Sequence, residues 1–185
     1  MSETRHRTYH LLGSLIKFHA FPEETGGGCG IVEILTAPGA GAPPHKHPGE
    51  DENFFVLDGQ FEFDLDGQKL DVGTGDFVKI PDGRVHAFKF VGDKPGRLLN
   101  VTSPGTMREV FFTEAGDPVP EGTVEFPAAD GPPDLDRIMT IADRIGLTIL
   151  KPESSAPSLR GERLEILPYD ITVSKEILDA KHLNN

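Results

Sequence analysis

The chain consists of short apolar runs that glycine and proline interrupt at close intervals, a pattern too broken for long helices. Its 185 residues include 21 glycines and 16 prolines. One run reads FEFDLDG, in which Phe61, Phe63 and Leu65 alternate with acidic residues before an Asp-Gly pair. Apolar residues at every second position line one face of a strand, and Asp-Gly favours a tight turn. The sequence therefore predicts an all-β sandwich or barrel.

The same reasoning divides the first part of the chain into strands and turns. Residues 11–21 are apolar enough for one strand, and the glycines of TGGGCG turn the chain toward the next, IVEILTA. Asp58-Gly59 is predicted to close a hairpin, and Asp66-Gly67 to form a second tight turn. Further strands are predicted at 54–57, 61–65, 69–72, within 73–81, at 84–91 and at 97–103, the last of which completes the barrel.

The pattern changes after these strands. Residues 106–115 and 134–145 carry apolar side chains at three- and four-residue spacing, which predicts two short amphipathic helices. Asp134 is a candidate N-cap of the second helix, and Gly146 is a candidate stop. Because an apolar stripe on a helix is usually a packing face, we expect only a packing role for both.

Length and charge limit what the chain can be. We expect residues 1–150 to form one barrel with its appended helices, and residues 151–185 to be a linker-like tail able to dock on a partner subunit. A net charge of −12 repels phosphate backbones and anionic membrane surfaces. The polar start, MSETRHRTYH, lacks the apolar core of a signal peptide, and no apolar run is long enough for a membrane span. We expect a soluble, cytoplasmic protein that binds neither nucleic acid nor membrane.

One segment, residues 39–59, indicates a chemistry. His45 and His47 lie one residue apart, so on an extended backbone both imidazoles leave the same face of a strand. Glu52 follows a Pro-Gly turn and could return a carboxylate oxygen to the same point. Two nitrogens and one oxygen suit most divalent transition ions. The alternative is a solvated loop in which histidines and acids happen to cluster.

A partner for this segment lies downstream, in the run RVHAFKFV. His86, Phe88 and Phe90 occupy every second position and therefore share one face of a predicted strand. His86 could supply a third imidazole to the same ion. His10 and His19 have no partner at ligand spacing, and we expect them to be surface or structural residues.

Fixed spacings join these residues to a wider set of glycines and prolines. The first block contains Gly39, His45, His47, Glu52 and Gly59, and the second contains Gly75, Pro81, Gly83 and His86. These blocks resemble the two motifs of the cupin superfamily over residues 39–90. The departure is Phe90, which stands where the family has an asparagine four residues after the histidine. By general pattern, residues 10–150 resemble small single-domain cupins often described as quercetin-dioxygenase-like.

The resemblance implies a single conical barrel of antiparallel strands, the double-stranded β-helix or jelly roll, with one or two short C-terminal helices. It also implies four metal ligands: His45, His47, Glu52 and His86. Three imidazoles and a carboxylate would leave open positions on a five- or six-coordinate ion, and Fe(II), Mn(II), Ni(II) or Zn(II) would be accepted. Glu50 is the main rival of Glu52, which we prefer because it keeps the family's six-residue spacing to Gly59.

The position of Phe90 predicts a cavity less polar than the family pattern would give. We expect four apolar residues to line the substrate pocket: Phe54, Val56, Phe88 and Phe90. Such a pocket suits a flat or hydrophobic substrate. The alternative is core packing, which suffices for at least half of the four.

The resemblance favours an enzyme, a metal-dependent dioxygenase similar to quercetin 2,3-dioxygenases that acts on a small aromatic or enol substrate. Glu52 would accept the substrate's hydroxyl proton. One alternative is a non-catalytic module that binds the metal or a small ligand. Another is a metal-dependent isomerase or lyase, against which Phe90 and the lack of an evident basic cluster argue. Exposed barrel edges favour a homodimer.

Overall fold

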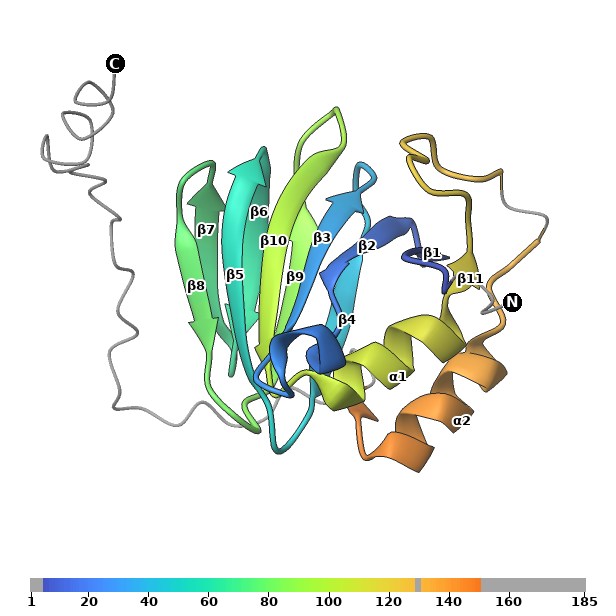
Figure 1. Cartoon of the computed structure of the whole chain (residues 1–185). Helices are drawn as coiled ribbons and strands as arrows, with labels where there is room; N and C mark the ends of the chain where they lie inside the picture. The colour runs from blue at the N-terminus through green and yellow to red at the C-terminus, as the bar shows by residue number, and fades with distance from the viewer. Residues whose placement is uncertain (1–4, 129–130, 151–185) are drawn as a thin grey trace, which may run out of the picture.

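The strands form two antiparallel sheets that pack face to face. The computed structural model describes residues 5–128 and 131–150. The larger sheet contains, in spatial order, β11 (Asp117–Pro118), β1 (Thr8–Leu11), β2 (Ser14–Ala20), β3 (Gly30–Thr36), β10 (Gly96–Ser103), β5 (Asp51–Asp58) and β8 (Phe77–Ile80). The smaller sheet contains β12 (Thr148–Ile149), β4 (Gly41–Lys46), β9 (His86–Phe90), β6 (Gln60–Leu65) and β7 (Gln68–Gly73). This jelly roll confirms the predicted all-β fold (Figure 1).

Alternating apolar residues from both sheets meet in the interior. Phe61, Phe63 and Leu65 of β6 are buried, as their period of two predicts. Phe54 of β5 contacts Phe63 across the two sheets, with ring centroids 5.2 Å apart. The core of the barrel therefore forms from the same alternation that defines the strands.

The strand predicted over residues 11–21 is confirmed for Ser14–Ala20, which is β2, but its predicted start is wrong. The chain forms a hairpin here, in which β1 and β2 pair with Leu11 opposite Ser14. Leu12 and Gly13 make the turn with φ angles of 49° and 77°. A leucine with positive φ is uncommon, so an apolar residue at this turn reads as a continuation of the strand.

The two Asp-Gly pairs have different outcomes. Asp66 and Gly67, with φ angles of 50° and 83°, close the predicted hairpin between β6 and β7. Asp58-Gly59 does not close a hairpin, because β5 pairs with β10 and β8 whereas β6 pairs with β9 and β7. The chain crosses from one sheet to the other here, with Gly59 at φ 94°. An Asp-Gly pair alone therefore does not determine whether two strands form a hairpin, because this depends on their pairing with distant strands.

Both predicted helices are confirmed. They are α1 (Thr106–Ala115) and α2 (Leu135–Ile145), and a short 3-10 helix, η1 (Pro22–Thr25), precedes β3. Asp134 caps α2 by accepting a hydrogen bond of 2.9 Å from the Arg137 N–H, and Gly146 ends it in the left-handed conformation. In the described part of the chain, no helix has the length and apolar character needed to cross a membrane.

The two helices pack side by side, next to the β1–β11 edge of the larger sheet (Figure 1). After α2 the chain returns to the smaller sheet, and β12 pairs with β4, placing Ile149 opposite His45. We refer to α1, α2 and β12 together as the helical cap. The tail predicted over 151–185 lies outside the described residues.

A glycine at the start of β10 allows the core rings to pack closely. A Cβ on Gly96 would lie 2.3 Å from Phe90 Cε2 and 2.9 Å from Phe61 Cζ. We expect Gly96→Ala to lower the free energy of unfolding by about 1–3 kcal/mol, because two buried rings must shift. Gly30→Ala in β3 is the matched control, since the atom nearest to its added Cβ, Pro22 Cγ, would be 3.6 Å away. Urea unfolding measures both variants, and equal stabilities would contradict this prediction.

Candidate metal centre

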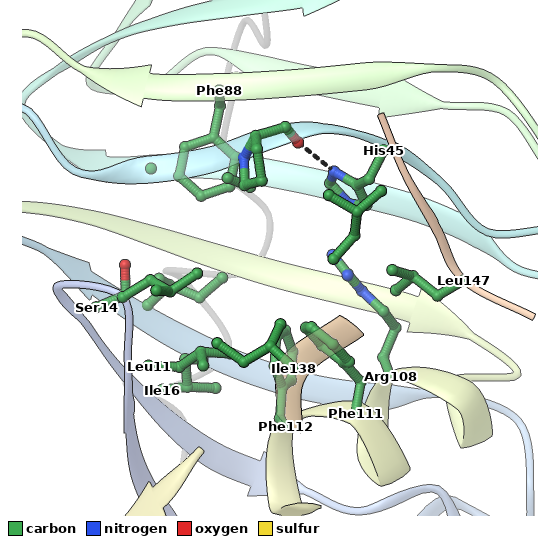
Figure 2. A pocket seen from close by; sticks show the side chains of 16 residues that line it. Leu11, Ser14, Ile16, His45, Phe88, Arg108, Phe111, Phe112, Ile138 and Leu147 are labelled. Carbon is green, nitrogen blue, oxygen red and sulfur yellow. Dashed lines mark hydrogen bonds between the residues drawn. The ribbon is translucent and has the colours of Figure 1, made fainter. Parts of the chain in front are cut away.

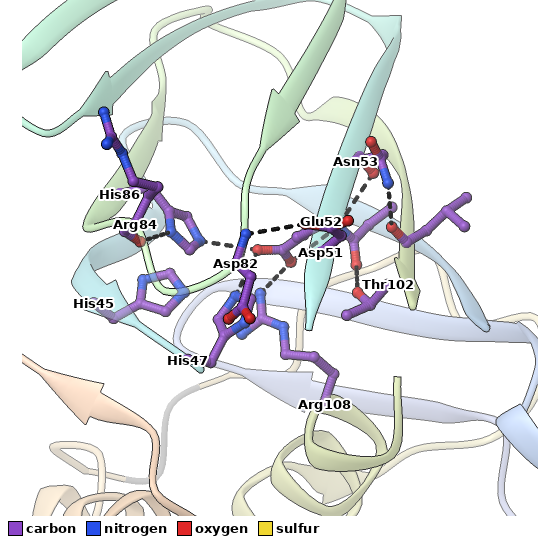
Figure 3. A network of polar contacts seen from close by, with 12 residues as sticks. His45, His47, Asp51, Glu52, Asn53, Asp82, Arg84, His86, Thr102 and Arg108 are labelled. Atoms are coloured by element: carbon purple, nitrogen blue, oxygen red, sulfur yellow. Dashed lines mark hydrogen bonds and ion pairs between the residues drawn. The ribbon is translucent and has the colours of Figure 1, made fainter. Parts of the chain in front are cut away.

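The four predicted ligands converge inside the barrel. His45 on β4 lies directly opposite His86 on β9, His47 follows the end of β4, and Glu52 lies near the start of β5. All four side chains are buried, and one ligand atom of each lies within 4.8 Å of the others. The structure thus brings together the set expected from the sequence (Figure 3).

Backbone carbonyls determine which nitrogen is protonated in two of the imidazoles. The Nδ1 atom of His45 lies 2.8 Å from the Pro43 oxygen, and that of His86 lies 3.0 Å from the Arg84 oxygen. A carbonyl oxygen only accepts, so each Nδ1 carries a hydrogen, and the Nε2 of a neutral ring presents a lone pair. Burial, reinforced by the charges of His86 and Arg108, lowers the pKa of His45 well below 6.5 and keeps that ring neutral.

The Nε2 atoms are arranged as ligands of a cation. His45 Nε2 is buried without a hydrogen-bond partner among the described residues. The Nε2 atoms of His47 and His86 lie 3.0 and 2.9 Å from Glu52 Oε2. Because the Nδ1 of His86 carries the hydrogen, the lone pair of its Nε2 faces a carboxylate oxygen, and a positive charge between the two would relieve the repulsion. Neighbouring ligands on an octahedral ion with bonds of about 2.1 Å stand about 3 Å apart. The residues present therefore fit a divalent metal ion.

The other oxygen of Glu52 is held by side chains outside the ligand set. Oε1 accepts a hydrogen bond of 2.9 Å from Asn100 Nδ2 and another from Arg108 Nη2. Thr102 orients the Asn100 amide by donating to its oxygen at 3.1 Å. Burial acts to raise the pKa of Glu52, but Arg108 and the neighbouring imidazoles outweigh it and hold the pKa well below 4.5. Glu52 is therefore charged and fixed with Oε2 toward the imidazoles.

Hydrogen bonds connect the loops of the two sequence motifs. The Gly49 N–H donates to Asp82 Oδ1 at 2.6 Å, and the Asp82 N–H donates to Asp51 Oδ1 at 3.0 Å. Asp51 and Lys46 are both exposed, and neither belongs to the cluster. The Asp82-Gly83 turn of the second motif therefore fixes the loop that carries His47.

Glu50, the rival of Glu52, has a different contact. Its Oε1 accepts a hydrogen bond of 2.8 Å from the Met107 N–H in the first turn of α1. The first N–H groups of a helix lack partners within the helix, so a carboxylate stabilises them. Burial raises the pKa of Glu50. The structure thus joins Glu50 to the helical cap and leaves it outside the ligand cluster.

An apolar cavity of about 70 Å³ lies beside the cluster, between the barrel and the helical cap (Figure 2). At the polar end of the cavity, Arg108 extends from α1 toward His45. Its apolar walls include Ile16, Ile34 and Phe88 from the barrel and Phe111, Phe112 and Ile138 from the cap. Sites for drug-sized ligands measure roughly 300–1,000 Å³, so this cavity suits a compact ligand.

Of the four residues expected to line the pocket, Phe88 borders this cavity. Phe54 and Val56 are completely buried in the barrel core. Phe90 packs against Phe61 with ring centroids 5.0 Å apart, and is not among the residues that line the cavity. Phe54, Val56 and Phe90 are therefore core residues, which is the alternative that the sequence analysis left open for this set.

The sequence prediction missed the contribution of α1. Arg108 precedes Phe111 and Phe112 by three and four residues, so all three side chains lie on one helix face. A charged residue within an apolar stripe is a signal that could have identified Arg108. The expectation that the helices only pack is therefore corrected, because Arg108 of α1 lines the cavity and binds Glu52.

The part of the chain that carries the cluster is similar in sequence to known proteins. The Cupin domain family model matches residues 32–102, which include all four candidate ligands. Quercetin 2,3-dioxygenase of Bacillus subtilis (strain 168) is 32% identical over 108 residues, or 58% of this chain and 31% of that protein. Protein SchB of Streptomyces halstedii is 31% identical over 108 residues, or 56% of this chain and 78% of SchB. The chain thus spans less than a third of the length of the Bacillus enzyme.

A solved structure supports the fold. An RmlC-like cupin from Shewanella frigidimarina NCIMB 400 superposes with a TM-score of 0.50 at 21% identity, covering 60% of this chain and 93% of that one. At this identity the likeness concerns the fold alone. The two-sheet jelly roll, the family match and the similarity to SchB together show that the chain belongs to the cupin superfamily.

Proposed function

We propose that this protein is a metal-dependent oxidoreductase of the dioxygenase type that acts on a small aromatic or enol substrate. The observation that carries the proposal is the convergence of three imidazoles and one carboxylate, one of which, His45, also lines an apolar cavity. Four protein ligands leave one or two positions open on a five- or six-coordinate ion, as catalysis requires. The similarity to quercetin 2,3-dioxygenase supports the same class.

The residues divide between holding the ion and holding the substrate. We propose Fe(II), Mn(II) or Ni(II) as the resident ion, with Zn(II) also suited to the donor set. When bound, it would supply Lewis acidity to a substrate oxygen. Pro43 and Arg84 orient two imidazoles through their carbonyl groups. Phe88, Phe111 and Phe112 would contact a flat apolar substrate and exclude water from it.

The contacts of Glu52 favour a ligand role over a role as proton acceptor. Its Oε1 is occupied by Asn100 and Arg108, and its Oε2 lies near the Nε2 atoms of His47 and His86. Neither oxygen is directed at the open cavity. We therefore assign Glu52 to holding the ion rather than to accepting the substrate's hydroxyl proton.

The small cavity favours a second candidate function, a binding module without turnover. A volume of about 70 Å³ is small for a flavonol, and both α1 and α2 close over the space. A compact ligand could be held at the metal centre in this closed arrangement without any movement of the helical cap. A dioxygenase acting on a larger substrate would require the cap to move.

Oxygen uptake by metal-loaded protein separates the two functions. The full chain is loaded in turn with Fe(II), Mn(II) and Ni(II), its metal content is measured, and oxygen consumption is followed over a panel of flavonols and catechols. We expect metal-dependent uptake with at least one substrate, its loss in His86→Ala and its retention in His19→Ala, which changes an exposed histidine. Stoichiometric metal without uptake on any substrate would contradict the dioxygenase and support the binding module.

A further inference from the structure

The proposed chemistry uses Arg108 only as a partner of Glu52. The arginine side chain is 8% exposed, and among the described residues that line the cavity it alone carries a permanent charge. An arginine cannot lose its proton in a protein, so its charge has to be balanced by an acceptor group. A buried cation at the end of an otherwise apolar cavity suggests a role in recognising a ligand.

The guanidinium has more donors than the protein supplies acceptors. Arginine carries five N–H donors, of which one on Nη2 binds Glu52 Oε1. Arg108 Nε is buried and has no hydrogen-bond partner among the described residues. Glu52 Oε1 already accepts from Asn100 as well, so it has no further capacity to offer. A buried unpartnered donor is costly, and a ligand oxygen in the adjacent cavity would relieve that cost.

The side chain is held in position before any ligand arrives. Its Cζ atom lies 5.0 Å from the centroid of the Phe112 ring, and its far end is paired with Glu52. The first turn of α1 is anchored in turn, because Glu50 binds the N–H of the preceding residue, Met107. A group that is already fixed loses little entropy on binding, which increases the affinity it can contribute.

The charges around the site also favour an anion. Glu52 offsets the charge of Arg108, and the three imidazoles are neutral when they bind a metal. A divalent ion would add two positive charges, of which Glu50, buried beside His47 and Arg108, could offset at most one. Excess positive charge in a buried site attracts a negatively charged ligand strongly, because water screens it little.

We propose that Arg108 is a specificity-determining residue that selects ligands with one negatively charged oxygen, a carboxylate or an ionised enol, on a compact apolar body. The guanidinium binds the charged oxygen, while Phe88, Phe111 and Phe112 contact the remainder. This inference rests on the proposed function, since it names the substrate class of the same site. It assigns to the helical cap the choice of ligand and to the barrel the binding of the ion.

Calorimetric titration with small acids and their amides tests the proposal. Acetate, isobutyrate and benzoate are each compared with the neutral amide, using the metal-free and the metal-loaded full chain. We expect at least one acid to bind more tightly than its amide in both forms. We expect Arg108→Gln to reduce that preference by roughly 10- to 100-fold, as the loss of a charge-assisted hydrogen bond predicts.

Two further variants separate recognition from structure. Arg144→Gln removes an exposed charge from α2 and should leave the preference for acids unchanged. Arg108→Lys keeps the charge and should retain a reduced preference, which also serves if Arg108→Gln fails to fold. Equal affinity for acids and amides in the wild type, or an undiminished preference in both Arg108 variants, would overturn the proposal.

The outcome is independent of turnover. If acids are preferred through Arg108 but no oxygen is consumed, the dioxygenase proposal fails and the role of Arg108 stands. If oxygen is consumed but the preference for acids survives in Arg108→Gln and Arg108→Lys, the metal alone selects the anion and the role of Arg108 fails.

Discussion

His47→Ala is expected to abolish stoichiometric binding of a divalent ion. His47 is 1% exposed, and its Nε2 lies 3.0 Å from Glu52 Oε2, so the variant would lose one of the four candidate ligand atoms. Changes to groups that merely orient metal ligands cost 10- to 100-fold in affinity, so loss of a ligand should raise the dissociation constant by at least roughly 100-fold. Elemental analysis after dialysis measures the metal content.

A surface histidine provides the control for this result. His19 lies on β2 with its side chain 41% exposed, and its ring contacts Glu33 rather than the cluster. His19→Ala should therefore bind metal as the wild type does. Full metal occupancy in His47→Ala would show that the four-ligand assignment is incorrect.

Glu52→Gln is expected to destabilise the metal-free protein by about 3–5 kcal/mol, because it leaves the buried charge of Arg108 without its anion. Glutamine keeps the size of the side chain, so little of the loss would come from a cavity. Urea unfolding of the metal-free chain measures the change in the free energy of unfolding. A loss below about 1 kcal/mol would mean that this ion pair does not help to hold α1 against the barrel.

Two controls isolate the charge effect. The double variant with Arg108→Met should recover much of the lost stability, since it removes the unpaired cation as well. Glu114→Gln breaks the ion pair between Glu114 and Arg144, in which the side chains are 47% and 55% exposed. This change should lower the free energy of unfolding by no more than about 1 kcal/mol. Equal losses of stability in Glu52→Gln and Glu114→Gln would show that burial does not strengthen the effect of breaking the Glu52 pair.

The cluster of candidate ligands was predictable because short, regular spacings place its members on strand faces. His45 and His47 share a face through the period of a strand, and His86 shares its face with Phe88 in the same way. The caps of α2 were predictable for a similar reason, since Asp134 and Gly146 act on backbone groups within one turn of themselves. Local chemistry decides these features, so one sequence suffices to find them.

Features that depend on distant contacts were not predictable in this way. The Asp58-Gly59 pair joins two sheets because of the partners that β5 and β6 find elsewhere in the chain. The cavity forms only where α1 and α2 meet the barrel, so Phe54 and Phe90 could not be assigned to core or pocket from their period alone. The same period of two describes a residue that faces a ligand and one that faces another side chain.

The position of β12 has a consequence for comparing relatives. This short strand pairs with the strand that carries His45, and so fastens the helical cap to the metal centre. The span matched by the family model ends at residue 102, before the cap begins. Proteins alike over that span can share their ion chemistry and still accept unrelated molecules. If the cap selects the ligand as proposed, exchanging it between two such barrels would transfer ligand choice while the candidate ligand histidines stay in place.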